Sequence, residues 1–231
     1  MIQKPVILKI FFVLLEVKQY NIAIIFAMYF AMTNTCKLCK IGLGGDNMTN
    51  NYKIYKDTRN ASWQFLIDHQ IGKLPIDLKS ITASMGVKIL VDKTRKIVSQ
   101  KGYGVTIYHN DMTIIAVSPD LSKQTTRYTI AHEIGHIVLG HTLSDMPTLT
   151  PTEQEYQAER FAIGILAPAC VLWGLGLHTP EEIASFCDIS LASAKIRAER
   201  MKTLYARNAF LLSPLERQVF QQFKPYIDSL K

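Results

Sequence analysis

The sequence has 231 residues, 48% of them hydrophobic, and a formal net charge of +7 at pH 7. The length and apolar content suffice for a buried core, and the charge is modest for a protein that binds nucleic acid. Four cysteines exclude a disulfide framework. Cys170 and Cys187 lie among apolar residues, which is typical of reduced core thiols in a cytoplasmic protein.

The first 47 residues differ in composition from the remainder of the sequence. Their apolar runs, 6–15 and 22–32, are both shorter than the about 20 apolar residues that cross a bilayer, and no clean signal-peptide cleavage site follows them. The residues GGDNM at 44–48 can be encoded by a purine-rich stretch that resembles a bacterial ribosome-binding site before a start codon. We therefore expect translation to start at Met48. A membrane anchor or signal peptide is the alternative, and it applies only if residues 1–47 are native.

The next segment predicts a small sheet. The run IDLKSITASMG at 76–86 is helix-like with Gly86 as its C-cap, and VKILV at 87–91 is typical of a strand. The run GYGVTIYHNDMTIIAVS at 102–118 has two β-rich parts around Asn110 and Asp111, which predicts a hairpin.

Three of the six histidines fall within TIAHEIGHIVLGH at 129–141. His132 and His136 are four residues apart, so they share one face of a helix and their rings can both reach one zinc ion. Glu133 then lies beside the metal, which completes an H-E-x-x-H motif. Apolar neighbours indicate a mostly buried helix, in which these polar groups would be costly without a metal. The alternative is that both histidines are hydrogen-bonded core residues.

A third metal ligand has to come from elsewhere in the sequence. His141 does not fit the metzincin pattern, in which the third histidine follows the second by six residues, and we expect it at the helix C-terminus. A second helix, opened by Thr150 or Thr152 and ended by Pro168, carries three carboxylates. They are Glu153, Glu155 and Glu159. Spacing alone does not choose among them.

The two helices together resemble the signature of the ImmA/IrrE family of zinc metallopeptidases, with RYTIAHEIGHIVLGH at 127–141 and EYQAERFAIGILAP at 155–168. The second helix of that family reads E-x-x-A-[ND]-x-F-A and ends in a proline. This sequence meets the pattern at Glu155, Ala158, Phe161, Ala162 and Pro168. The resemblance implies that Glu155 is the third ligand. Glu159 departs from the family's Asn or Asp, and its carboxylate could accept a hydrogen bond from a ligand histidine.

The resemblance implies hydrolysis of peptide bonds, with Zn²⁺ held by His132, His136 and Glu155. Zinc would lower the pKa of water to about 7, and Glu133 would carry the proton of that water to the leaving amine. An edge strand of the predicted sheet could pair with an extended peptide substrate. The oxyanion-stabilising residue stays open among Tyr128, Tyr156, His141 and His178.

A helical region is predicted from residue 176 to the end. Thr179, Pro180 and Glu182 start one helix, 188–190 interrupt it, and LASAKIRAERM at 191–201 forms the next. This pair resembles a helix-turn-helix, and its second helix carries basic residues that could meet DNA. They are Lys195, Arg197, Arg200 and Lys202. The family resemblance favours a scaffold or partner-docking role, so we do not expect direct DNA binding.

These observations predict an α+β protein, with a compact zincin-like metallopeptidase core at 48–175 and a helical, helix-turn-helix-like region at 176–231. We expect a cytoplasmic zinc-dependent endopeptidase. The family resemblance implies that its substrate is a helix-turn-helix repressor of a mobile element or stress regulon, which would make the chain an anti-repressor. The alternative is a DNA- or protein-binding regulator with a silent peptidase site, and the presence of Glu133 argues against it.

Overall fold

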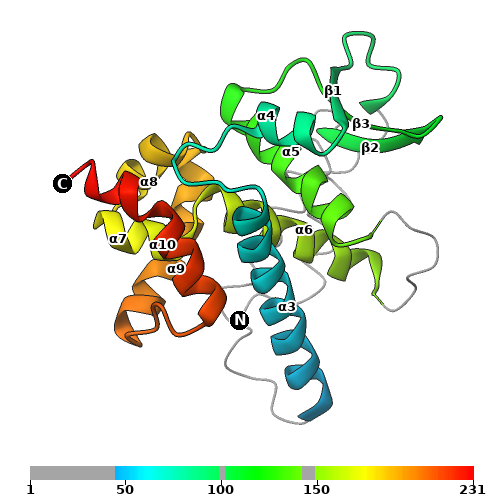
Figure 1. The fold of residues 1–231 in the computed structure, drawn as a ribbon. Coiled ribbons are helices and arrows are strands. Elements are labelled where there is room, and N and C mark those ends of the chain that lie inside the picture. The colour runs from blue at the N-terminus through cyan, green and yellow to red at the C-terminus, as the bar shows by residue number, and fades with distance from the viewer. Residues whose placement is uncertain (1–44, 99–101, 142–148) are drawn as a thin grey trace, which may run out of the picture. The chain divides into compact units, whose positions relative to one another are not determined.

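The computed structural model describes residues 45–98, 102–141 and 149–231 (Figure 1). Within the chain, Asn50–Lys231 form one compact unit. The predicted leader lies outside the described residues, except for 45–47, which belong to the first turn of a helix. The start at Met48 and the division between residues 175 and 176 stay predictions.

Helices predominate in the described part of the chain. The elements in chain order are helices α3 (Gly45–Asp68) and α4 (Leu78–Ser84), strands β1 (Val87–Val91), β2 (Gly104–His109) and β3 (Met112–Val117), and helices α5 (Lys123–Val138), α6 (Pro151–Leu166), α7 (Ala169–Leu175), α8 (Pro180–Cys187), α9 (Leu191–Ala206) and α10 (Pro214–Asp228). The predicted α+β class with a small sheet is confirmed. Helices α3 and α7 are additions to the predicted set.

The sheet has the strand order β1-β3-β2, with β1 parallel and β2 antiparallel to β3. The β2–β3 hairpin turns at Asn110 and Asp111, whose φ angles are 43° and 60°. Two positive φ angles define the tight turn that matches the twist of a hairpin, and Asn and Asp tolerate them better than most residues. The predicted hairpin is confirmed, and it leaves β2 at one edge of the sheet.

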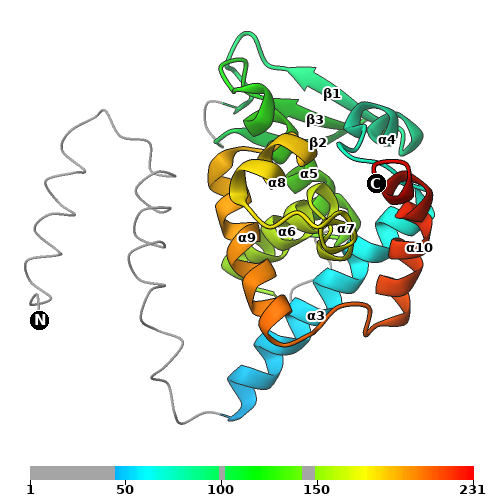
Figure 2. The same ribbon diagram turned by 90° about the vertical axis from the view of Figure 1, so that its left-hand side faces the viewer.

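Helix α5 packs against β2 and β3 on one side and against α6 on the other, so that it lies between the sheet and the other helices (Figures 1 and 2). The N-cap of α5 is Ser122, whose hydroxyl accepts a hydrogen bond from the Thr125 amide. Helix α6 begins with a capping box between Thr150 and Glu153 and has Pro151 in its first turn. Of the two predicted N-caps, Thr150 is the one that the fold uses.

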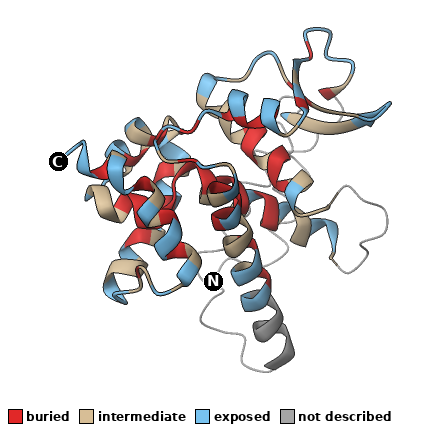
Figure 3. Ribbon diagram, viewed as in Figure 1, coloured by how far each residue is buried: buried red, intermediate tan, exposed pale blue. Residues whose placement is uncertain are grey.

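The hydrophobic core follows the inward faces of these helices and continues into α7–α10 (Figure 3). Phe161, Ile165 and Leu166 on α6 are fully buried, as is Ile134 on α5. The segment Pro151–Leu175 is long and apolar enough to cross a membrane by length and composition, but 56% of its most apolar window is buried inside the fold. Its apolar side chains are therefore accounted for by core packing.

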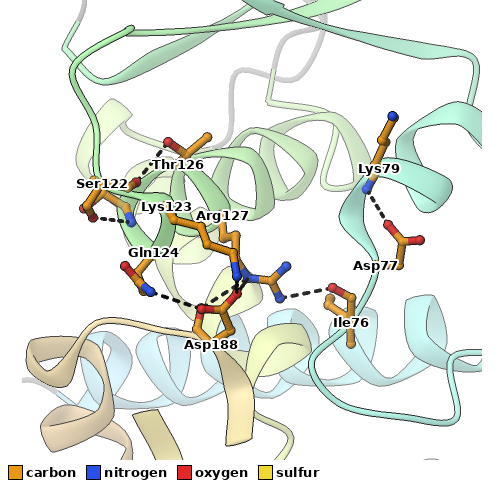
Figure 4. A network of polar contacts seen from close by, with 10 residues as sticks. Ile76, Asp77, Lys79, Ser122, Lys123, Gln124, Thr126, Arg127 and Asp188 are labelled. Carbon is orange, nitrogen blue, oxygen red and sulfur yellow. Dashed lines mark hydrogen bonds and ion pairs between the residues drawn. The ribbon is translucent and has the colours of Figure 1, made fainter. Parts of the chain in front are cut away.

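A polar network fixes the start of α5 (Figure 4). Arg127 donates from Nε to the Asp188 carbonyl at 3.1 Å and from Nη2 to the Ile76 carbonyl at 3.0 Å. The Asp188 carboxylate accepts from Gln124 Nε2 at 3.1 Å and pairs with Lys123 Nζ at 2.7 Å. The Lys123 contact is the main reason that the pKa of Asp188 is lowered. The network joins α5 to the loop before α4 and to the turn between α8 and α9.

The four basic residues of α9 do not share one exposed face, because Lys195 and Lys202 are exposed whereas Arg197 and Arg200 contact other helices. Arg197 is buried and donates from Nη2 to the Ile163 carbonyl of α6 at 2.6 Å. Arg200 donates to the Tyr55 hydroxyl of α3 at 2.9 Å. Both guanidinium groups thus complete contacts within the fold, which periodicity in α9 alone could not reveal. The last helix, α10, packs against α7.

Candidate metal centre

Close contact between α5 and α6 brings the predicted site residues together. A Cβ atom on Gly135 would lie 3.2 Å from both Cα and O of Ala158, so the absence of a side chain allows the two backbones to approach. Gly135 is adjacent to His136, and Ala158 is one turn after Glu155. The contact therefore places the histidine face of α5 opposite the first half of α6.

The atoms His132 Nε2, His136 Nε2 and the carboxylate of Glu155 converge at this contact. The two nitrogens are 3.0 Å apart, Glu155 Oε2 is 3.2 Å from His132 Nε2, and Glu155 Oε1 is 3.5 Å from His136 Nε2. The histidine side chains are 17% and 13% exposed, whereas Glu155 is 61% exposed. The group is thus embedded on the α5 side and open to solvent on the α6 side.

These three residues could hold a metal ion, because each offers one ligand atom and all three atoms lie within 4.8 Å of one another. Ligands at about 2.0 to 2.2 Å from one tetrahedral zinc lie about 3.3 to 3.6 Å apart, which is close to the spacing here. Two neutral imidazole nitrogens that face each other need a shared proton or a cation between them. A divalent ion meets that need and also balances the carboxylate.

The other carboxylates of α6 lie outside this group. Glu153 Oε2 accepts hydrogen bonds from the amide and the hydroxyl of Thr150, both at 2.8 Å, so it serves the helix cap. In the described chain no hydrogen bond joins Glu159 to His132 or His136. The hydrogen bond that Glu159 could accept from a ligand histidine is thus not formed there, and the Nδ1 atom of His136 contacts His141.

His141 follows the end of α5, as expected, but its imidazole points back toward the site. Gly140 has a φ of 73° and reverses the chain, and the His141 amide bonds to the His136 carbonyl at 3.0 Å. His141 Nδ1 lies 3.1 Å from His136 Nδ1, and His141 Nε2 lies 2.8 Å from Oε1 of Gln157 on α6. Burial lowers the pKa of His141 and lowers that of His136 to about 4, so both rings are neutral at neutral pH.

Glu133 is buried on the side of α5 that faces the sheet. Its Oε2 accepts a hydrogen bond of 2.8 Å from the hydroxyl of Thr106 on β2. Burial raises the pKa of Glu133, and the Thr106 hydroxyl opposes that change. Sequence reasoning missed Thr106 and Gln157; a polar residue within an apolar strand was the only local signal for Thr106.

The residues that sequence left open for the oxyanion occupy different places. His141 contacts His136, and the ring of His178 packs on Tyr205 of α9 with centroids 4.9 Å apart. Tyr128 lies beside His132, with ring centroids 6.5 Å apart, and burial raises the pKa of its hydroxyl. Tyr156 follows Glu155 directly, and Arg160 lies over its ring. Tyr128, Tyr156 and His141 thus adjoin predicted ligands, but both nitrogens of His141 are already engaged, by His136 and by Gln157.

A surface groove runs along β2, and its lining includes Thr106, which bonds to Glu133. Its walls are Ile97, Val105, Thr106, Ile107 and Tyr108. In the described sheet β2 is an edge strand, a position at which a further strand can be added. The groove and the sheet edge therefore both lie at β2, the strand whose Thr106 hydroxyl donates to Glu133 of α5.

Comparison with known proteins identifies a family that this chain matches. Residues 85–199 match the family model Peptidase_M78, described as the IrrE N-terminal-like domain. The matched region runs from the end of α4 into α9, and it includes the whole sheet and the three residues that converge. A search of curated protein sequences gives no match.

Proposed function

We propose that this chain, which belongs to the ImmA/IrrE family of metallopeptidases through its residues 85–199, is a zinc-dependent endopeptidase. The observation that carries the proposal is the convergence of His132, His136 and Glu155, with the carboxylate of Glu133 in the next position of the same helix. Two histidines that served only as hydrogen-bonded core residues would need neither the exposed carboxylate of Glu155 nor the buried carboxylate of Glu133.

The donor set supports zinc as the metal. Two imidazole nitrogens and one carboxylate are typical ligands of catalytic zinc, which keeps a fourth position for water or substrate. When bound, zinc would act as a Lewis acid that lowers the pKa of a water molecule and polarises the peptide carbonyl. The exposure of Glu155 supports access of substrate from the α6 side.

Glu133 is the proposed general base. Its raised pKa suits a group that takes a proton from water and returns it to the leaving amine nitrogen. The hydroxyl of Thr106 donates to Oε2 of Glu133 and so orients the carboxylate that would accept that proton. Tyr128 keeps its proton at neutral pH, and we propose its hydroxyl as the donor that stabilises the oxyanion.

The substrate is proposed to bind as an extended peptide along β2, at the edge of the sheet. Backbone hydrogen bonds to an edge strand give affinity, and the groove beside the strand would take substrate side chains. This arrangement, with a metal-binding helix beneath a sheet edge, is the zincin-like feature of the proposal. It supports cleavage within a chain, because an edge strand is open at both ends.

The proposed substrate is a cytoplasmic helix-turn-helix repressor, as the resemblance to the ImmA/IrrE family implies. Helices α8 and α9 are then a scaffold or partner-docking region. The inward orientation of Arg197 and Arg200 supports that role over contact with DNA. A regulator with a silent peptidase site is the alternative, in which the repressor would be bound and left intact.

The test uses the full chain with a helix-turn-helix repressor, to be sought first in the neighbouring reading frames. We expect one zinc per chain, strong loss of zinc in His136→Ala, and retained zinc with lost cleavage in Glu133→Gln. Glu153→Gln is the matched control, because it makes the same exchange at the N-terminus of α6. Glutamine at this position can also accept the hydrogen bond from the Thr150 amide, so the capping box is kept. Full cleavage by Glu133→Gln would refute the mechanism, and stable binding without cleavage by the parent would support the regulator.

A further inference from the structure

The ring of His136 is held at both of its nitrogens. Nε2 faces His132 and Glu155, and Nδ1 lies 3.1 Å from Nδ1 of His141. The rings of His136 and His141 meet edge to face, with centroids 5.0 Å apart. Because Gly140 turns the chain back on the helix, this contact is built into the C-terminus of α5.

The second nitrogen of His141 reaches the other metal-binding helix. His141 Nε2 lies 2.8 Å from Oε1 of Gln157, which is buried on α6 two residues after Glu155. The contacts therefore run from His136 through His141 to Gln157, and they join the end of α5 to the start of α6.

The carbonyl oxygen of the Gln157 side chain determines which nitrogen of each histidine carries a proton. The Oε1 atom of Gln157 only accepts, so His141 Nε2 carries a proton and, in the neutral ring, His141 Nδ1 accepts. His136 Nδ1 must then donate. The lone pair of His136 consequently lies on Nε2, the atom that faces His132 and Glu155, which is the form that a metal requires.

We propose that His141 and Gln157 are positioning residues, which fix the tautomer and the ring orientation of His136 as a metal ligand. The inference rests on the proposed metal centre and adds two residues to it. Neither residue is one of the three predicted ligands, and His141 contacts one of them, at Nδ1 of His136. Outer partners of ligand histidines typically contribute about 10- to 100-fold to metal affinity.

The experiment measures zinc affinity of the full chain by competition with a chromophoric chelator, after removal of bound metal. We expect Gln157→Leu to weaken zinc binding by about 10- to 100-fold, because leucine cannot accept the His141 proton. His141→Phe should do the same, since phenylalanine keeps the ring packing and removes both nitrogens. Gln157→Glu restores an acceptor and should bind zinc as the parent does.

Gln154→Leu is the matched control, because Gln154 lies on the same helix and its amide bonds to the Leu149 carbonyl. It should leave zinc affinity unchanged. A second measurement needs no substitution: long-range ¹H–¹⁵N NMR of the zinc-loaded parent should show His136 protonated at Nδ1 and His141 at Nε2. Zinc affinities are compared only for variants whose circular dichroism spectrum matches that of the parent.

The outcomes separate this inference from the proposed function. A parent chain that binds no zinc overturns the metal centre itself. A parent that binds zinc while Gln157→Leu and His141→Phe bind it equally well overturns the positioning role alone. A proton on His136 Nε2, or on His141 Nδ1, in the zinc-loaded parent likewise overturns it.

Discussion

Replacing Thr106 by valine tests how the sheet acts on the proposed base. The change removes the hydroxyl that donates to the Glu133 carboxylate at 2.8 Å and keeps the size of the side chain. A hydrogen bond to a charged group contributes about 1.5 to 3 kcal/mol. Loss of that much stabilisation of the ionised carboxylate corresponds to a fall in kcat/KM of about 10- to 150-fold on the acidic side of the pH profile.

The direction of the pH effect follows from the role of Glu133. Only the ionised carboxylate can accept a proton, so activity increases as pH rises through its pKa. Burial already raises that pKa, and removal of the Thr106 bond raises it further. The acidic limb should move to higher pH, and the defect should shrink at high pH, where Glu133 is ionised in both proteins.

The assay is the pH dependence of kcat/KM for repressor cleavage, with zinc content measured in parallel. Thr106→Ser keeps the hydroxyl and should keep the acidic limb of the parent. Thr113→Val makes the same exchange on β3, where Thr113 pairs with Tyr108, and should also resemble the parent. An acidic limb that stays in place in Thr106→Val, or that moves equally in Thr113→Val, would refute the reasoning.

Three further predictions concern stability and partners. Burial and the neighbouring His132 lower the pKa of His136 from 6.5 to about 4, so the metal-free fold should lose stability as pH falls through this range; constant urea midpoints between these pH values would contradict this. Arg127→Met should lower the free energy of unfolding in urea by about 2 to 4 kcal/mol, because it removes both hydrogen bonds of the Arg127 guanidinium. The control Arg95→Met, at an exposed ion pair with Asp120, should lower it by less than about 1 kcal/mol. Equal losses in the two variants would contradict the stabilising role of the network. Duplex DNA should bind weakly or not at all by fluorescence anisotropy, and tight, sequence-specific binding would favour the regulator.

Several parts of the site were predictable because they depend on neighbours in the sequence. The spacing of His132 and His136 places both rings on one face of any α-helix, and the capping box at Thr150 marks where α6 begins. Asn110 and Asp111 likewise indicate the hairpin, since the turn needs residues that tolerate positive φ. Such features need only contacts within a few residues.

The family resemblance supplied what spacing could not, which was the choice of Glu155 among three carboxylates. The fold supplies a physical reason for the convergence: the backbones of α5 and α6 approach at Gly135 and Ala158, and the face of α6 that meets the histidines carries Glu155. Glu153 lies two residues before Glu155 on the helix and bonds to its own cap.

Other contacts were decided only by tertiary structure. Thr106 reaches Glu133 because a strand 27 residues earlier packs against α5, and Arg197 turns inward because the Ile163 carbonyl lies beneath α9. His141 meets Gln157 only once α5 and α6 cross. Each of these bonds depends on the relative placement of two elements, and that placement comes from the packing of the whole core, which no local pattern of residues encodes.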